Sequence, residues 1–325
     1  MSLHGKKILV AGATGMVGTA ILARLLYHDS DLLIRACYHH TEPFFLNPRI
    51  EYVKSNIASQ EECSRIGMGC DCAVMAAART SGVGTLTAQP WQQINDNLFM
   101  NANLLQGLAM SNMRRLVFIG SATLYQPFDG HIRENQLDLN QNPPDAYTGI
   151  GWVTRFNEKL CEFWHRQSGM DIMIIRASNV FGPFARFNPQ TSNFIPAIIR
   201  KAVDRMDPFE IWGSPEVTRD VIHADDFARA VVLMLERDDI HFDVFNIGSG
   251  VQTTVDDVVT WALKYADYTP SRIQYNDQRP TTAAFRALDC SKARSKLDWI
   301  PQISIDAGIK NTLEWWQENK NWWNK

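Results

Sequence analysis

Long blocks of like charge, long apolar runs and a large net charge are all missing from this sequence. Its 325 residues carry 32 lysines and arginines against 35 aspartates and glutamates, a formal net charge of −3 at pH 7. A nucleic-acid-binding protein usually carries a basic patch or stripe, so we expect no nucleic-acid partner. No stretch reaches the roughly 20 apolar residues of a membrane helix, and the N-terminus lacks the pattern of a signal peptide. We therefore expect no membrane association.

Cysteine is also sparse. The six cysteines are scattered, and only Cys70 and Cys72 lie close together, in "GCDCAVMAAA". No second pair of ligands follows them, so we interpret both as strand residues and expect no metal site. Scattered cysteines in apolar surroundings are typical of reduced thiols, which favours a cytoplasmic location.

Apolar runs of strand length alternate with helix-like segments over the first half of the chain. The strand-like runs include "KKILVA", "LLIRACYHH", "IEYVKSNI", "CDCAVMAAA", "RRLVFIGSA" and "MDIMIIRASN". Strands that alternate with helices through short loops predict an α/β fold, here a Rossmann-like, doubly wound parallel sheet covered on both faces.

After Pro183 the rhythm changes to a polar loop followed by shorter elements. We expect this part to form a smaller α/β substrate domain, interleaved with the first domain. The predicted division assigns 1–180 and 219–248 to the dinucleotide-binding domain, and 181–218 and 249–325 to the substrate-binding domain.

A glycine-rich turn, "GATGMVG", follows the first strand and precedes the first helix. Gly12 allows the chain to leave the strand tightly, Gly15 allows the backbone to approach a pyrophosphate, and Gly18 allows helix and strand to pack closely. The helix N-terminus favours the phosphate charge. The turn therefore predicts a dinucleotide site.

Further motifs extend along most of the chain: "AAARTSG", "GSATLYQP", "RASNVFGP" and "WGSPEVTRDVIHADDFARA". Together with the turn, they resemble the extended short-chain dehydrogenase/reductase superfamily, in particular its NAD(P)-dependent nucleotide-sugar epimerases and dehydratases. Through "FIPAIIRKA", "KLCEFW" and "WGS" the pattern is most like that of the GDP-L-fucose synthase group, which acts on a GDP-4-keto-6-deoxy sugar.

The resemblance implies a nicotinamide cofactor held by residues of the turn and of several strand ends. These are Gly12, Thr14, Gly15, Met16, Val17, Gly18, His39, Asn56, Ile57, Ala76, Ala77, Ala78, Tyr147, Ala177, Asn179 and Val180.

The choice between NAD and NADP depends on the end of the second strand. An acidic residue there would bind the ribose 2′-hydroxyl of NAD. "RACYHHTEP" has none at that point, whereas Arg35, His39 and His40 are candidates for a 2′-phosphate. We therefore favour NADP over NAD.

The resemblance also implies catalytic residues. Ser121 matches the serine that positions the sugar oxygen, and Tyr147 is a candidate for the tyrosine that exchanges its proton. Thr123 stands where the GDP-L-fucose synthase group carries a cysteine, and Asn193 where it carries a histidine. A neutral hydroxyl is a poor base and an amide is no acid at neutral pH, so both epimerisation groups are expected to be absent.

The family's Tyr-x-x-x-Lys pair lacks its lysine in either of two registers. If Tyr147 is the family tyrosine, Gly151 replaces the lysine. If the helix "EKLCEFW" sets the register, the pair falls at Ile150 and Thr154. A lysine normally brings the tyrosine pKa, roughly 10 when unperturbed, towards the working pH. Neither register supplies one.

On the substrate side, Arg219 matches the family arginine that binds a nucleotide diphosphate, a task that suits its planar guanidinium. The other substrate-binding candidates are Asn179, Asn193, Lys201, Trp212 and Arg279. We expect a nucleotide-diphosphate sugar, with a GDP-sugar favoured. The helix from Trp152 to Arg166 has a broad apolar face, which relatives pair into a dimer, so a homodimer is expected.

Two functions fit these observations. The first is an NAD(P)-dependent nucleotide-sugar epimerase, dehydratase or reductase with an atypical active site. The alternative is a non-catalytic homologue that binds the dinucleotide or the sugar nucleotide as a sensor or partner subunit.

Overall fold

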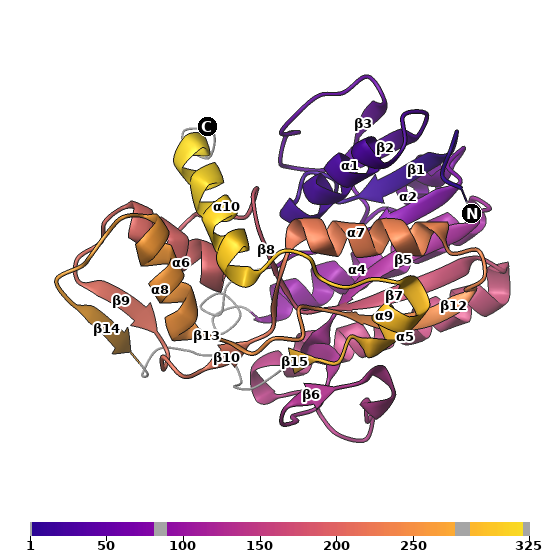
Figure 1. Ribbon diagram of the computed structural model, residues 1–325. Coiled ribbons are helices and arrows are strands. Elements are labelled where there is room, and N and C mark those ends of the chain that lie inside the picture. The colour runs from indigo at the N-terminus through magenta and orange to yellow at the C-terminus, as the bar shows by residue number, and fades with distance from the viewer. Residues whose placement is uncertain (1, 81–89, 277–286, 321–325) are drawn as a thin grey trace.

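The computed structural model describes residues 2–80, 90–276 and 287–320 (Figure 1). Its centre is a parallel sheet of seven strands in the order β12-β7-β5-β4-β1-β2-β3. The strands are β1 (Lys7–Ala11), β2 (Leu33–Tyr38), β3 (Ile50–Lys54), β4 (Cys72–Met75), β5 (Arg115–Ser121), β7 (Asp171–Ala177) and β12 (Phe242–Ile247). The order reverses between β1 and β4, as in a doubly wound sheet. The predicted fold class is confirmed.

Helices cover both faces of this sheet. On one face α1 (Met16–His28) packs against α7 (Ala224–Glu236), and on the other α2 (Gln60–Gly67), α4 (Pro90–Met110) and α5 (Thr148–Ser168) lie side by side (Figure 1). Successive strand residues supply the two cores, because their side chains alternate between faces. In β1, Ile8 and Val10 belong to the first core and Leu9 and Ala11 to the second.

A second lobe lies beside the carboxyl edge of the sheet (Figure 1). It contains α6 (Phe194–Val203), the parallel pair β9 (Phe209–Trp212) and β14 (Ile273–Asn276), α8 (Val255–Tyr265) and α10 (Ile305–Asn319), around an apolar core of its own. The predicted domain boundaries themselves stay a prediction.

Short elements connect the two lobes. They are η1 (Ala122–Leu124), β6 (His131–Ile132), η2 (Glu134–Gln136), η3 (Asp145–Tyr147), β8 (Asn179–Phe181), β10 (Thr218–Arg219), β11 (Val221–His223), β13 (Thr253–Thr254), β15 (Ala287–Leu288) and α9 (Ser291–Leu297). Strand β8 pairs with β11, and β10 pairs with β13. The chain thus passes between the lobes more than once.

All six cysteines are free. Cys72 lies in β4, as predicted, but Cys70 precedes that strand, because β4 begins only at Cys72. Within the described ranges, no helix combines the length and the apolar character that a membrane span requires.

Candidate active site

The glycine turn lies at the carboxyl edge of the sheet, between β1 and α1. Thr14 is buried in it, and Met16 and Val17 open the helix. Gly15 is the N-terminal cap of α1; in the described part of the chain no side chain hydrogen-bonds to this first turn, and the turn holds no acidic residue. The first backbone N–H groups therefore remain available to an anion.

The three glycines of the turn have different surroundings. Gly12 has a φ of +80°, and a β-carbon there would lie 2.5 Å from the backbone of Ala77. A β-carbon on Gly18 would lie 2.1 Å from the carbonyl oxygen of Gly12. At Gly15 the nearest atom is that same oxygen, at 3.5 Å. Gly12 and Gly18 are thus required by the fold, whereas Gly15 leaves open space in front of the helix.

At the end of β2, the three candidates for the 2′-phosphate of the cofactor differ in their exposure and in their hydrogen bonds. Arg35 is engaged elsewhere, because its guanidinium donates to Glu51 at 3.0 Å and to the carbonyl oxygens of Ile66 and Met68. Arg35 thus already has partners within the fold, and its role as a phosphate ligand stays a prediction. His39 and His40 are exposed, with ring centroids 3.8 Å apart.

Burial lowers the pKa of His39, and the neighbouring charges of His40 and Lys54 lower it further. Lys54 is the last residue of β3 and was not singled out in the sequence. Asn56 lies exposed after this strand, where its side-chain oxygen accepts from the N–H of Ala58 at 3.1 Å, and Ile57 is buried. A small basic cluster thus lies beside the predicted ribose site.

Strand ends bring further predicted residues to the same edge. Ala76 follows β4 and hydrogen-bonds to Ala11, with Ala77 and Ala78 next along the chain. Ala177 ends β7 and is the register partner of Ser121 in β5. Asn179 and Val180 begin β8, where the Asn179 amide donates to the Asp220 carbonyl oxygen at 3.1 Å.

Ser121 and Thr123 form a pair of hydroxyls at the end of β5. The Ser121 oxygen accepts from the Thr123 hydroxyl at 3.1 Å and from the Thr123 N–H at 3.2 Å. Both bonds use the Ser121 oxygen as acceptor, so its hydroxyl proton is not used in either of them. Thr123 supports this serine.

The rotation of α5 about its axis is fixed by a buried ion pair. Arg176 of β7 donates to both carboxylate oxygens of Glu158, each at 2.8 Å, and also to the Tyr125 hydroxyl. Both partners of the ion pair are almost fully buried. Residues one turn apart lie on the same helix face, so Thr154 and Ile150 share the face of Glu158.

The two candidate lysine positions have different environments. The γ-methyl of Thr154 lies 3.6 Å from the point where a β-carbon of Gly120 would stand, next to Ser121. A β-carbon on Gly151 would instead lie 2.6 Å from Pro143 and 2.8 Å from the carbonyl oxygen of Thr123. Gly151 therefore has no room for a side chain, whereas the Thr154 side chain lies beside Gly120, near the end of β5.

Other basic residues of α5 are engaged. Arg155 is buried and donates to the carbonyl oxygens of Leu124 at 2.7 Å and Gln141 at 2.6 Å. Lys159 is exposed and pairs with Glu162. Neither points its charge at Ser121.

Arg219 and Tyr147 lie near enough to each other to interact electrostatically. Burial lowers the pKa of the Arg219 guanidinium, and the nearby Tyr147 hydroxyl opposes that effect. Arg219 donates to the Thr218 carbonyl oxygen at 3.2 Å and lies in β10. Tyr147 precedes α5 as its N-terminal cap.

The remaining substrate candidates are more dispersed. Trp212 is 45% exposed at the end of β9. Lys201 donates to the Glu210 carbonyl oxygen at 2.6 Å, which ties α6 to β9, and burial lowers its pKa. Asn193 is the exposed N-terminal cap of α6. Arg279 lies outside the described residues.

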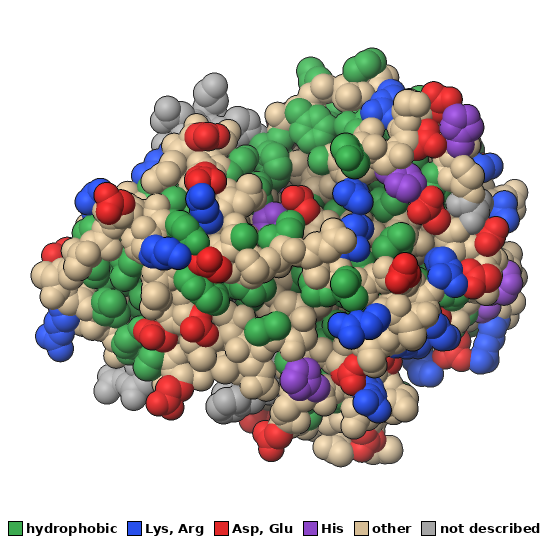
Figure 2. Space-filling view, in the orientation of Figure 1, with side chains coloured by type: hydrophobic (Ala, Val, Ile, Leu, Met, Phe, Trp, Pro, Cys, Tyr) green, Lys and Arg blue, Asp and Glu red, His purple; other side chains and the backbone are tan. Residues whose placement is uncertain are grey.

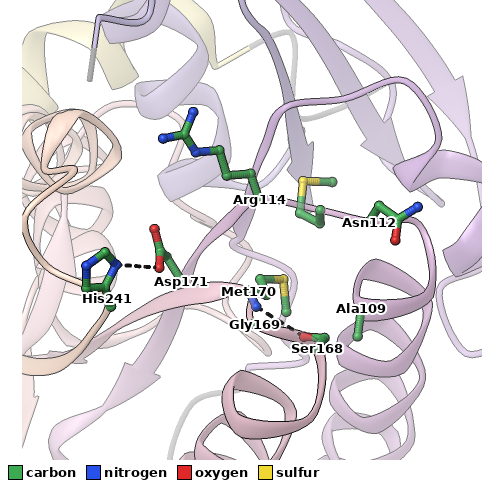
Figure 3. A pocket seen from close by; sticks show the side chains of 9 residues that line it. Ala109, Asn112, Arg114, Ser168, Gly169, Met170, Asp171 and His241 are labelled. Atoms are coloured by element: carbon green, nitrogen blue, oxygen red, sulfur yellow. Dashed lines mark hydrogen bonds and ion pairs between the residues drawn. The ribbon is translucent and has the colours of Figure 1, made fainter.

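A shallow depression of about 460 Å³ lies at the opposite, amino edge of the sheet (Figure 3). His241 and Asp171 pair there at 2.9 Å, and Ser168 accepts from the N–H of Met170 at 3.3 Å. It shares no residue with the predicted site. Ligands of open α/β sheets bind at the carboxyl edge, so the amino-edge depression is not the candidate active site.

The sequence was then compared with known families and proteins. Residues 8–248 match the pattern of the "NAD dependent epimerase/dehydratase family". The chain belongs to that family. The predicted resemblance is thereby confirmed, as is the classification as an enzyme of this family.

Individual relatives agree with this assignment. The chain is 27% identical to GDP-L-fucose synthase of Escherichia coli (strain K12), over 97% of this chain and 98% of the relative. Its fold is similar to that of UDP-glucose 4-epimerase of Thermotoga maritima solved with UDP-glucose, with a TM-score of 0.85, 22% identity, and coverage of 97% and 99%. UDP-glucose 4-epimerase of Bifidobacterium longum, solved with NAD+ and UDP, gives a TM-score of 0.83 at 23% identity, with coverage of 97% and 99%.

Proposed function

We propose that this enzyme transfers hydride between NADP(H) and one carbon of a nucleotide-diphosphate sugar, with an active site that lacks the family lysine. The observation that carries the proposal is the position of Thr154, whose γ-methyl lies 3.6 Å from the point where a β-carbon of Gly120 would stand, beside Ser121. It favours the register in which Ile150 and Thr154 occupy the Tyr and Lys positions. The alternative of a non-catalytic binding protein has no observation in its favour.

The same site supports hydride transfer better than epimerisation. Epimerisation at a carbon beside a carbonyl needs a base and an acid on the two faces of the sugar. Thr123 is engaged with Ser121, and Asn193 carries only an amide. Reduction of a keto sugar adds hydride from NADPH to the carbonyl carbon and one proton to its oxygen, and the proposed route for that proton is from solvent through the Ser121 hydroxyl; this is the reaction that these residues favour.

A GDP-sugar is the proposed substrate. Its support is the similarity to GDP-L-fucose synthases and, at 25% identity, to GDP-mannose 3,5-epimerase of Arabidopsis thaliana. Arg219 is the proposed diphosphate ligand, because it is half-buried and flanked by Tyr147 in the segment that joins the lobes.

Replacing Arg219 tests this assignment. Arg219→Ala should weaken binding of the preferred sugar nucleotide by about 1.5–3 kcal/mol, roughly 10- to 150-fold, because a charged hydrogen bond is lost. Arg219→Lys should restore only part of the lost affinity, since an ammonium lacks the planar, bidentate geometry of a guanidinium. The measurement is calorimetry over GDP-, UDP-, dTDP- and CDP-sugars, with Arg237→Ala, whose side chain pairs with Asp239, as the control. Equal affinities in Arg219→Ala and the parent protein would contradict the assignment.

NADP is the proposed cofactor, and its 2′-phosphate is assigned to His39, His40 and Lys54. A phosphate dianion beside His39 would raise its pKa above the lowered value of the free protein. Protonation is then favoured in the complex, so NADP(H) affinity should rise as pH falls through the pKa of the complex. The rise should level off below the pKa of the free protein, while NAD(H) affinity stays flat.

Titrations between about pH 8 and pH 5, where histidines change charge, measure this difference. Lys54→Gln should lower the affinity for NADP(H) and leave that for NAD(H) unchanged. The same pH dependence for both cofactors would count against a 2′-phosphate site at this cluster.

A homodimer is proposed through α4 and α5, which pack together and expose large apolar side chains. Phe99 of α4 is 59% exposed, and Phe156 and Phe163 of α5 are 51% and 50% exposed. Leu160 and Trp164, also apolar residues of α5, instead pack against the core. Exposed apolar side chains gathered on two adjacent helices favour a protein partner, and a second copy is the proposed one.

Phe156→Arg should convert the dimer into a monomer, because it places a charge in an apolar interface. Sedimentation velocity gives the mass, and Gln167→Arg, which adds the same side chain at an exposed site of α5, is the control. A parent protein that sediments as a monomer would refute the dimer.

A further inference from the structure

Five aromatic rings join the loop that follows β2 to the C-terminal helix α10. The ring of Phe44 lies 4.6 Å from that of Phe184 and 6.3 Å from that of Trp315, and Phe184 lies 4.9 Å from Trp315. Phe187 stacks on Trp316 with centroids 4.1 Å apart. We call these five residues the aromatic bridge.

The bridge connects three segments that are distant in sequence. Phe44 belongs to the 39–49 loop, Phe184 and Phe187 follow β8, and both tryptophans lie on α10 in the second lobe. In Figure 1 the loop after β2 arches towards α10, and Figure 2 shows hydrophobic side chains gathered between them. The loop thus packs against the second lobe, although β2, the strand before it, belongs to the central sheet.

The conformation of Phe184 indicates that the bridge imposes a constraint. Its φ is +66°, an unusual value for a bulky residue. Such conformations persist only where the surrounding structure holds them. The contacts with Phe44 and Trp315 supply that restraint.

The bridge fixes the loop that carries the proposed ribose ligands. Further along the loop, Phe45 packs against the sheet core, and its carbonyl oxygen accepts from the Tyr52 hydroxyl at 2.7 Å. Phe44 fixes the part nearer His39 and His40. Without the ring of Phe44, the stretch from His39 to Phe45 would lose its attachment to the second lobe.

A second contact reaches the same lobe from the other side of the proposed cofactor site. Met16, directly after Gly15, packs against the apolar core of the second lobe, and so does Trp315. The glycine turn, through Met16, and the 39–49 loop, through Phe44 and Trp315, therefore both connect to the apolar core of the second lobe.

We propose that Phe44 is a positioning residue for the adenosine half of the cofactor, and that Trp315 of the second lobe sets cofactor affinity through it. The inference rests on the proposed dinucleotide site. Replacing residues that do not touch the cofactor would then change the affinity of the protein for the cofactor. A sugar nucleotide that orders the second lobe would raise that affinity.

The test compares Phe44→Ala, Trp315→Ala and their double variant. Leu46→Ala is the matched control, because Leu46 is in the same loop and 83% exposed. Binding of NADP(H), NAD(H) and the fragment 2′,5′-ADP is measured by calorimetry, alongside melting temperature and binding of the sugar nucleotide alone. Phe44→Leu, which keeps apolar volume, is added in case an alanine variant folds poorly.

Each single alanine variant should lower the affinity for both dinucleotides and for the adenosine fragment at least about fivefold. That is within the usual range of coupling between sites. The double variant should lose less than the sum of the two single losses, since both single variants break the contact between Phe44 and Trp315. Dinucleotide affinity in Leu46→Ala should change less than about twofold. Sugar-nucleotide affinity should also change less than about twofold in every variant.

Two failures are distinguishable. If the parent protein binds no dinucleotide, the proposed cofactor site fails and this inference with it. If the parent binds but Phe44→Ala or Phe44→Leu matches it, or the two alanine effects simply add, Phe44 is only a packing residue and the positioning role is overturned.

Discussion

Gly15→Val should abolish measurable dinucleotide binding while leaving the protein folded. The φ of Gly15 is −75° and its ψ is 165°, which valine adopts without strain, and the nearest atom to a β-carbon there is 3.5 Å away. A branched side chain would occupy the approach to the first N–H groups of α1. Charged hydrogen bonds contribute about 1.5–3 kcal/mol each, so loss of two should lower affinity about 100-fold or more.

Thermal unfolding and calorimetry with NADP(H) and NAD(H) together measure this prediction. The cost to stability should be about 1 kcal/mol, since valine is a poorer N-terminal cap than glycine. Ala23→Val adds the same side chain on the exposed face of α1 and should preserve binding. Gly18→Ala should instead destabilise the fold, because its β-carbon meets the Gly12 carbonyl at 2.1 Å. Retained binding in Gly15→Val would refute the turn as the phosphate site.

The double variant Ile150→Tyr with Thr154→Lys should raise turnover about 10²- to 10⁴-fold, the usual contribution of a positioned acid–base group. The two positions are one helical turn apart on the face that Glu158 and Arg176 orient. Thr154 lies beside Gly120, next to Ser121, so a lysine there is expected to extend towards the proposed nicotinamide site. Nicotinamide absorbance with the 4-keto form of the preferred sugar nucleotide is the assay.

Gly151→Lys is the comparison that distinguishes the two registers. Its β-carbon would meet Pro143 and the carbonyl oxygen of Thr123, so this variant should lose stability and gain no activity. Thr154→Lys alone should give little, because Ile150 carries no proton to transfer. High turnover in the parent protein that is insensitive to Ser121→Ala would mean that a different group performs the proton transfer.

The sequence alone was sufficient for the fold class and the family. Strand and helix periods are local properties, and the sheet found between β1 and β12 follows from their alternation. The glycine turn is local too, since its spacing after a strand defines the geometry within a few residues. The family motifs added the expected family and enzyme class, which the family match bears out.

Side-chain contacts with a partner distant in sequence were shown only by the tertiary structure. Arg35 was one of three candidates for a phosphate ligand, and nothing in the sequence shows that Glu51 is its register partner on β3. The two registers of α5 stayed open because the ion pair between Glu158 and Arg176, and the close packing at Gly151, involve other elements. The same holds for Phe44, whose contacts come from α10 and the segment after β8. Periodicity determines which element a residue belongs to, but packing between elements determines what its side chain touches.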